Sequence, residues 1–185
     1  MEVFLISIPF TIYELYWVFF CDHETKSDKD KIRFFEGITL SLSSSYLECW
    51  QYFNDKVQQF PKSAIAHFYL GKCHAFYENF PAAIESFQQS LNLDNTLRDT
   101  YFEKAKAHFA IEEFDESLFE LKRATWHFHD KNTEVLLMKA KLEIRQGDFE
   151  SAEKSLILAI KLGDEDANFL LQKIKITNKF RPLYN

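Results

Sequence analysis

The chain contains little glycine and little proline, with four of each among its 185 residues. That scarcity suits an all-helical protein, because proline ends helices and glycine weakens them. With 46% hydrophobic residues the chain can bury a sizeable core. Its length fits one extended helical array as well as one globular domain.

Cysteine is also scarce, and its three positions have no metal-site spacing. Cys49 and Cys73 fall within helical patterns, whereas Cys21 follows an apolar stretch. An odd number of cysteines at such distances argues against a zinc site and against a disulfide framework. We interpret them as small hydrophobic residues in a reducing compartment.

The chain lacks an excess of basic residues, since its formal net charge is -6 and its pI is about 5.5. Nonspecific nucleic-acid binding needs a basic surface that releases counterions. No glycine-rich phosphate-binding loop occurs in the sequence. The sequence therefore predicts no nucleic-acid partner.

What the sequence does contain is an internal repeat over most of its length. Four units follow one another at 30–63, 64–97, 98–131 and 133–166, with one residue inserted near Asn132. The columns that match best are Phe34, Phe68, Phe102 and Leu137; Tyr46, Phe80, Phe114 and Phe149; and Phe53, Phe87, Leu121 and Leu156. Such a period, with two helical patterns in each unit, predicts a helical solenoid.

Each unit resembles a tetratricopeptide repeat (TPR). The eighth place of each unit holds a small residue, namely Gly37, Gly71, Ala105 and Ala140, and an aromatic residue opens each second helix. The segment GDFESA at 147–152 is similar to the usual turn between the two helices of the family. The resemblance implies an all-α superhelix of four helical hairpins. Residues 167–180 are expected to add a capping helix, with Phe169, Leu170, Ile174 and Ile176 facing the last repeat.

The ends of the chain differ from the repeats. We predict a hydrophobic helix over 1–22, a solvated linker over the charged stretch 23–29, and a frayed tail over 181–185. Residues 3–20 are almost continuously apolar and just long enough to span a bilayer. Aromatic residues near the end of this stretch are typical of a membrane interface, and the basic residues after it would place the repeats in the cytosol or on an equivalent reducing side.

Two other interpretations of residues 3–20 remain open. Glu14 is costly at a bilayer centre, which favours a helix that folds back against the array instead. Alternatively, Glu14 faces a polar group in a partner membrane helix. The first option corresponds to a soluble cytoplasmic protein, and the second to a membrane-associated one.

Candidate chemistry is sparse. His74 and His108 occupy the same place in adjacent repeats, and His127 and His129 flank Phe128, but zinc needs three or four ligands. No serine or cysteine has a recognisable nucleophile signature, and the paired acids at 112–116 lie on an expected turn. We therefore predict no enzyme activity, no metal, no cofactor and no small-molecule substrate.

The inner surface of the array is the strongest candidate site. In TPR arrays the first helices line a concave groove, and the resemblance implies that their fifth, ninth, twelfth and thirteenth places point into it. Those places supply an apolar strip and a row of cations: Phe34, Phe68, Phe102, Leu137, Phe76, Phe109, Lys72, Lys106, Lys141 and Arg145. The alternative is that the position-five residues simply pack between helices.

An apolar strip beside positive charge suits a peptide or amphipathic helix that carries acidic residues. The family's clamp for a chaperone's C-terminal carboxylate is absent, since its places hold Phe34, Ile38, Tyr69, Asp99 and Glu103. The predicted function is therefore a noncatalytic interaction scaffold, membrane-tethered within a larger assembly, that binds a protein partner. The alternative is a soluble structural subunit whose groove is filled by its own N-terminal helix.

Overall fold

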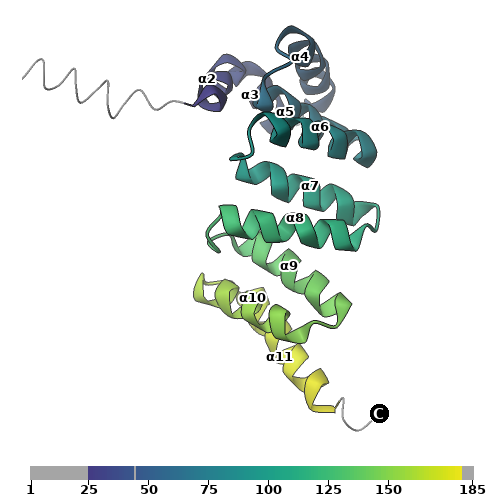
Figure 1. The fold of residues 1–185 in the computed structure, drawn as a ribbon, viewed down its shortest axis with the longest axis vertical. Coiled ribbons are helices and arrows are strands. Elements are labelled where there is room, and N and C mark those ends of the chain that lie inside the picture. The colour runs from purple at the N-terminus through teal and green to yellow at the C-terminus, as the bar shows by residue number, and fades with distance from the viewer. Residues whose placement is uncertain (1–24, 44, 181–185) are drawn as a thin grey trace, which may run out of the picture.

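A computed structural model describes residues 25–43 and 45–180, with side chains as far as residue 176. Within these ranges the chain forms helices and no strands, and successive helices stack into an elongated solenoid (Figure 1). The helices are α2 (Lys26–Arg33), α3 (Phe35–Leu42), α4 (Tyr46–Gln59), α5 (Ala64–Phe76), α6 (Phe80–Leu93), α7 (Arg98–Ala110), α8 (Phe114–His127), α9 (Thr133–Gln146), α10 (Phe149–Lys161) and α11 (Glu165–Phe180). The predicted all-α solenoid is confirmed.

Several helices begin at side chains that cap their first turn. The Ser63, Asn79, Asn132 and Asp148 side chains accept hydrogen bonds from backbone N–H groups in α5, α6, α9 and α10. Such caps satisfy donors that a helix start leaves free. The hairpin turns after α5, α7 and α9 all contain one left-handed residue in the same column, and only in the last turn is it glycine, Gly147.

Small residues let the two helices of a hairpin approach each other. A Cβ atom added to Gly71 would lie 2.6 Å from the Phe87 ring, and one added to Gly37 would lie 2.3 Å from Tyr52. In the third and fourth hairpins the same places hold Ala105 and the matching alanine, each of which is fully buried. The close approach predicted from the eighth place therefore exists in the structure.

The core runs along the array as successive apolar clusters between neighbouring helices. One cluster joins α3, α4 and α5 around Phe34 and Phe53, and another joins α6, α7, α8 and α9 around Tyr101 and Leu121. The first helices α5 and α7 also contact each other directly. Each hairpin therefore buries its open face against the next one, as expected for a solenoid.

The start of the described chain differs from the prediction. Thr25 and Asp28 form a capping box, and α2 begins at Lys26, so the prediction of a linker is wrong for residues 26–29. Ser27 is buried and its hydroxyl donates a hydrogen bond to Asp94, in the loop after α6. Ser27 can be buried because its hydroxyl has a hydrogen-bond partner elsewhere in the fold. Residues 1–22, with Glu14, and the tail 181–185 lie outside the described residues.

The first repeat also contains a break that the sequence pattern did not indicate. The helix stops at Phe34, whose φ is -102° and ψ is 21°, and α3 starts at the next residue. The break directs the Phe34 ring into the core, where its centroid lies 6.2 Å from Phe53 and 5.6 Å from Phe60.

The last helix packs against the array with only part of the predicted face: Ile174 is buried and Leu170 packs against the same apolar cluster, as predicted, whereas the predictions for Phe169 and Ile176 are wrong. Ala167, Leu171 and Ile174 are buried against α10, whereas Phe169 and Ile176 are exposed. The spacing of four and three residues places the buried three on one helical stripe. Phe169 lies two residues from both Ala167 and Leu171, about 200° around the helix from each, so it faces away.

Candidate functional site

The structure places the ten residues predicted to line the groove in three different environments. Among the position-five residues, Phe34 and Phe102 are buried, and Phe68 and Leu137 are half-buried. Phe34 and Phe102 belong to core clusters, so for these two the interpretation as packing residues is correct and a partner cannot contact them. Phe68 still presents part of its ring.

The position-nine lysines lie beside these aromatic rings. The Lys72 Nζ atom is 5.9 Å from the centroid of the Phe68 ring and 5.6 Å from that of Tyr69. The Lys106 Nζ atom is 4.8 Å from the centroid of the Phe102 ring and 2.9 Å from a carboxylate oxygen of Glu103. Lys106 is therefore partly neutralised within its own helix.

Lys141, the third of these lysines, is exposed. Within the part of the chain that the structure describes, neither Lys72 nor Lys141 forms an ion pair. Two of the three predicted lysines are thus available to a negative partner.

The remaining residues gather where the hairpin turns are. Phe76 ends α5, is 51% exposed, and stacks on Tyr46 at the start of α4 with ring centroids 3.4 Å apart. Phe109, near the end of α7, is 42% exposed and packs edge-on against Phe114. Arg145, near the end of α9, lies 3.8 Å from the centroid of the Phe114 ring. Exposed aromatic rings therefore lie in two neighbouring repeats along the turn edge.

A small hollow adjoins the first of these aromatic pairs. It has a volume of about 330 Å³ and is lined by Tyr46, Leu47, Phe76 and Tyr77, among others. Leu47 is itself exposed, so the hollow opens on an apolar rim. Such an apolar surface is suited to a large hydrophobic side chain of a partner.

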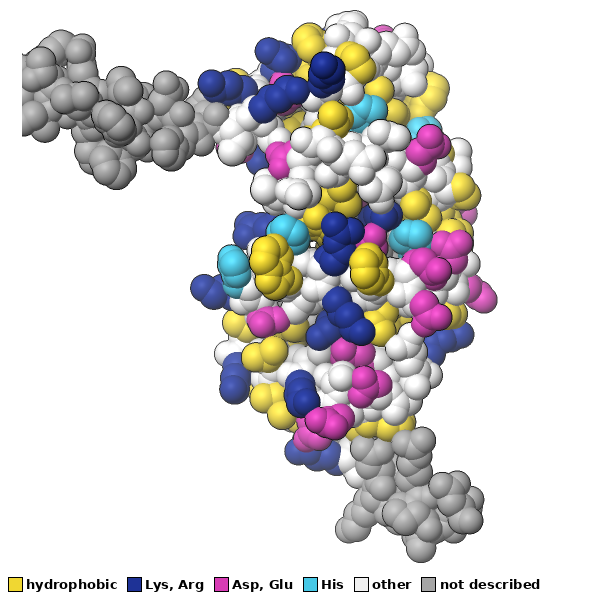
Figure 2. Space-filling model, viewed as in Figure 1, with side chains coloured by type: hydrophobic (Ala, Val, Ile, Leu, Met, Phe, Trp, Pro, Cys, Tyr) yellow, Lys and Arg dark blue, Asp and Glu magenta, His cyan; other side chains and the backbone are white. Residues whose placement is uncertain are grey.

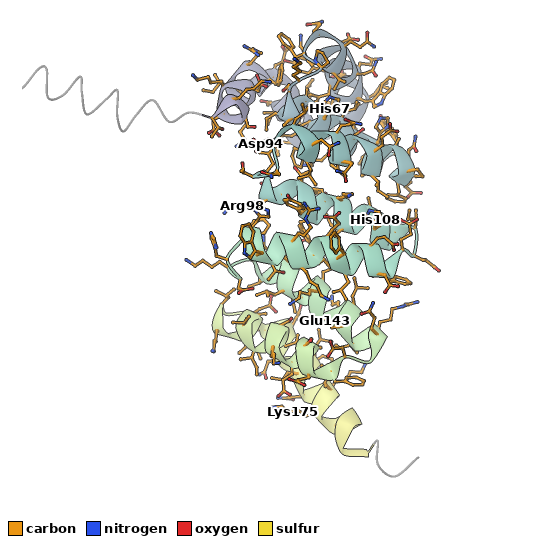
Figure 3. All side chains as sticks on the ribbon, in the orientation of Figure 1. His67, Asp94, Arg98, His108, Glu143 and Lys175 are labelled. Carbon is orange, nitrogen blue, oxygen red and sulfur yellow. The ribbon has the colours of Figure 1, made fainter. Side chains whose placement is uncertain are left out.

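Two networks of buried charged side chains are satisfied within the fold. Lys104 of α7 donates to Glu120 of α8 and to Gln88 of α6, both at 2.7 Å. In the next hairpin Ser155 donates to Glu143, which Figure 3 labels, at 2.9 Å. These buried charges tie neighbouring helices together. The sequence patterns gave no indication of either network.

The described histidines are not grouped into a metal site. His108 contacts Glu113 with 2.6 Å between Nδ1 and Oε2, at the turn edge of the array (Figure 3). Burial lowers the pKa of His74, so its imidazole is neutral near pH 7. Within residues 25–43 and 45–180, no three or more His, Cys, Asp or Glu side chains are grouped so that they could hold an ion.

None of the helices in the described part of the chain is long and apolar enough to cross a membrane. The predicted anchor, residues 3–20, lies outside that part.

Solved structures share this fold at low sequence identity. The TPR protein YrrB, described as having an unusual peptide-binding site, aligns with a TM-score of 0.69 and 16% identity, over 78% of this chain and 75% of its own. MamA from Desulfovibrio magneticus RS-1 aligns with a TM-score of 0.63 and 14% identity, over 75% and 77%. The first TPR domain of Spaghetti (RPAP3), bound to an HSP90 peptide, aligns with a TM-score of 0.58 and 16% identity, over 63% and 93%.

The family assignment comes from the sequence itself. No curated protein matches the chain. Residues 5–129, which are more than half of it, match the family described as Iml2/Tetratricopeptide repeat protein 39. The TPR resemblance is therefore confirmed, and the chain belongs to the Iml2/Tetratricopeptide repeat protein 39 family.

Proposed function

We propose that the chain is a noncatalytic scaffold that binds an acidic peptide or amphipathic helix of a partner protein along α5, α7 and α9. The fold is of the type used by protein–protein interaction scaffolds. The single observation that carries the proposal is Lys72 of α5 beside the half-buried Phe68 ring, with Lys141 of α9 exposed and neither lysine in an ion pair within the described chain. The partner would contact Phe68, Phe76 and Phe109, with Lys72 and Lys141 orienting its charges.

The chemistry of the partner follows from this arrangement. Exposed aromatic rings supply most of the affinity of an interface, while charges at its rim steer association and fix orientation. A negative partner suits Lys72 and Lys141, which form no ion pair in the described chain. Two of the similar structures are described as having a peptide site or a bound peptide, which supports a peptide as the partner class.

The membrane tether is a separate part of the proposal. It depends on the apolar run at residues 3–20 and on the basic residues that follow it. Washing membranes with alkaline carbonate tests it, because spanning helices stay in the pellet and peripheral proteins are released. Retention of the full-length chain in the pellet is the expected result, and release of the chain would refute the tether.

The binding face is tested by reversing the charge of two lysines. The variant Lys72→Glu with Lys141→Glu should lose binding to a labelled acidic amphipathic helical peptide, with unchanged helicity in circular dichroism. A matched control, Lys29→Glu with Lys161→Glu, makes the same change in net charge on α2 and α10 and should bind normally. Equal binding by both variants at physiological salt would show that this face is not the site.

The alternative function is a soluble structural subunit whose binding face is covered by its own N-terminal segment. Deleting residues 1–22 separates the two. A tether is dispensable for folding, so the truncated chain should unfold at the same temperature and bind the acidic peptide as before. If the truncated chain binds the peptide and the full-length chain does not, or if the array unfolds, the segment is part of the fold.

A further inference from the structure

A second surface, which the sequence patterns did not indicate, lies on α8. A hollow of about 800 Å³ adjoins this helix and the start of α7, lined by Tyr101, Phe119, Lys122, Arg123, Trp126 and His127, among others. Figure 2 shows hydrophobic, basic and histidine side chains side by side over α8. We refer to Phe119, Lys122, Arg123 and Trp126 as the α8 patch.

The α8 patch is a single stripe of the helix, because its residues are spaced by three and four positions. Trp126 is 72% exposed and Phe119 is 60% exposed. Between them the Arg123 guanidinium carbon lies 5.7 Å from the centroid of the Phe119 ring and 4.4 Å from that of Tyr101. The guanidinium also donates to the Tyr101 hydroxyl at 3.2 Å. The cation is thus held in place between aromatic groups.

The floor of the hollow is built by neighbouring rings. His127 stacks on Tyr101 with centroids 4.6 Å apart, and Trp126 meets His127 edge-on at 4.7 Å. Tyr101 is buried and donates its hydroxyl hydrogen bond to the carbonyl oxygen of Asn95. The patch therefore stands on an ordered base and needs little rearrangement to accept a ligand.

The fold does not require aromatic residues at these places, as the other repeats demonstrate. Phe119 and Trp126 correspond to Glu85 and Asn92 in α6, and to two exposed lysines in α10. Each of these repeats forms the same helical hairpin, so polar residues at these two places are compatible with the fold. Exposed tryptophan, phenylalanine and arginine on one stripe are the residues that carry binding energy in protein interfaces.

The charge of the hollow is positive, although the whole chain carries a net charge of -6. Lys122 and Arg123 supply it, and none of the described residues that line the hollow is acidic. Glu120 lies 3.4 Å from Arg123, but it is buried and shared with Lys104. Burial, Arg123 and His129 lower the pKa of His127, so that ring acts as a neutral aromatic surface.

We propose that the α8 patch is a second binding site of this chain, separate from the face on α5, α7 and α9, and that it takes an acidic peptide segment with a large apolar side chain. The apolar side chain of the peptide packs between Trp126 and Phe119, and its carboxylates pair with Lys122 and Arg123. A nucleic acid is disfavoured because the chain as a whole repels phosphates.

Two pools of short synthetic peptides test this proposal on the full-length chain. Both pools have a central Phe or Leu and no Trp, so that only the protein contributes tryptophan fluorescence; one pool surrounds this residue with Asp and Glu, the other with Lys and Arg. The acidic pool should bind about tenfold more tightly than the basic pool, as expected for paired hot-spot charges. Binding should shift the fluorescence of the exposed Trp126 to shorter wavelength.

The matched variant carries the residues of the second repeat, Phe119→Glu with Trp126→Asn. Both side chains are mostly exposed, so the variant should unfold at about the wild-type temperature, and its affinity for the acidic pool should fall about tenfold or more. The variant Lys72→Glu with Lys141→Glu should keep its fluorescence response, which separates failure of this site from failure of the other face.

Each contrary result overturns the proposal. Equal binding of the two pools, absence of binding to the acidic pool, or unchanged affinity in the Phe119→Glu, Trp126→Asn variant would rule out an acidic peptide at this site. Tighter binding of a single-stranded oligonucleotide would assign the patch to nucleic acid. Self-association that the same variant abolishes would assign it to a second copy of the chain.

Discussion

In each hairpin one residue of the first helix contacts one residue of the second, and the sizes of the two side chains are complementary. This complementarity can be tested by giving the second repeat the residue pair of the third. Gly71 faces Phe87 in the second repeat, where an added Cβ atom would lie 2.6 Å from the ring. The corresponding pair in the third repeat is Ala105 with Leu121, both fully buried. A larger residue on the second helix thus accompanies a smaller residue on the first.

The single substitutions should both destabilise the protein. Gly71→Ala forces the added methyl group against a ring that cannot move, which costs about 1–3 kcal/mol, offset by about 1 kcal/mol of improved helix propensity. Phe87→Leu removes buried ring atoms and costs about 1 kcal/mol. The net losses are therefore about 0–2 and about 1 kcal/mol.

The double variant Gly71→Ala with Phe87→Leu reproduces the pair of the third repeat. The clash disappears, and the gain in helix propensity offsets the lost ring, so its stability should be within about 0.5 kcal/mol of wild type. Urea unfolding followed by circular dichroism measures all four proteins of the cycle. The expected coupling energy is about 1–3 kcal/mol, as observed for residues in direct contact.

The result that refutes this reasoning is additivity. If the double variant loses the sum of the two single losses, Gly71 and Phe87 do not limit each other, and the close approach of α5 and α6 has another cause. Equal slopes of the unfolding free energy against urea concentration are required for the comparison, because a changed slope would indicate a changed denatured state.

Three further predictions concern other parts of the array. Glu112 has a φ of 63°, so Glu112→Gly should relieve left-handed strain and raise the thermal midpoint by a few degrees, whereas Glu112→Ala should not; an equal effect of both would contradict the strain. The sulfur atoms of Cys49 and Cys73 are 3.0 Å apart, so the oxidant diamide should link the two residues in an intramolecular disulfide, taking up the two thiol hydrogens. Peptide mapping should find the linked peptides in the wild-type chain and not in a Cys73→Ser control. If both cysteines stay unlinked in the treated wild-type chain, the contact is refuted. Burial would raise the pKa of Asp94, but hydrogen bonds from Ser27 and Thr96 outweigh burial and hold the pKa below its usual value. The stability that this confers is present near neutral pH and is lost as the pH falls through the lowered pKa. Ser27→Ala should therefore destabilise the chain by about 1 kcal/mol at pH 7 and by less in acid, and a loss of stability that does not depend on pH would contradict this.

The sequence was sufficient to predict the solenoid because the repeated columns are those that pack. Small residues such as Gly71 and large ones such as Phe87 recur at fixed places, since every hairpin has to bury the same contact. The third repeat confirms the same geometry with a different pair of residues. Periodicity therefore reports the core directly.

The start of the array could not be predicted from local pattern. Residues 26–29 are polar, and their helix depends on partners far along the chain, including Asp94 for Ser27 and the Lys62 carbonyl oxygen for Lys26. The amino-acid pattern of a short stretch does not indicate contacts with residues so far along the chain. A charged stretch then has the same composition whether it is solvated or docked.

The position-five residues show that a repeat column does not predict how exposed a side chain is. Phe68 and Phe102 occupy the same column, yet Phe102 is buried in the core and Phe68 keeps part of its ring exposed. Their exposure depends on how neighbouring hairpins are set against each other, which a column does not specify. The repeated columns could thus propose a candidate binding face without deciding which of its rings are exposed.

The α8 patch points to the kind of sequence comparison that finds binding sites in repeat proteins. Columns that are alike in all repeats, such as Phe87 with Leu121, hold the array together and are the ones that identify the fold. Columns that face solvent do not contribute to packing. When one repeat has a different type of residue there from the other repeats, packing does not explain the difference. Phe119 against Glu85 is a departure of this kind, because an aromatic ring is exposed where its counterpart in α6 is a solvated carboxylate. In a solenoid the conserved columns therefore specify the fold, and the exposed columns in which one repeat differs from its neighbours are where a specific partner should be sought.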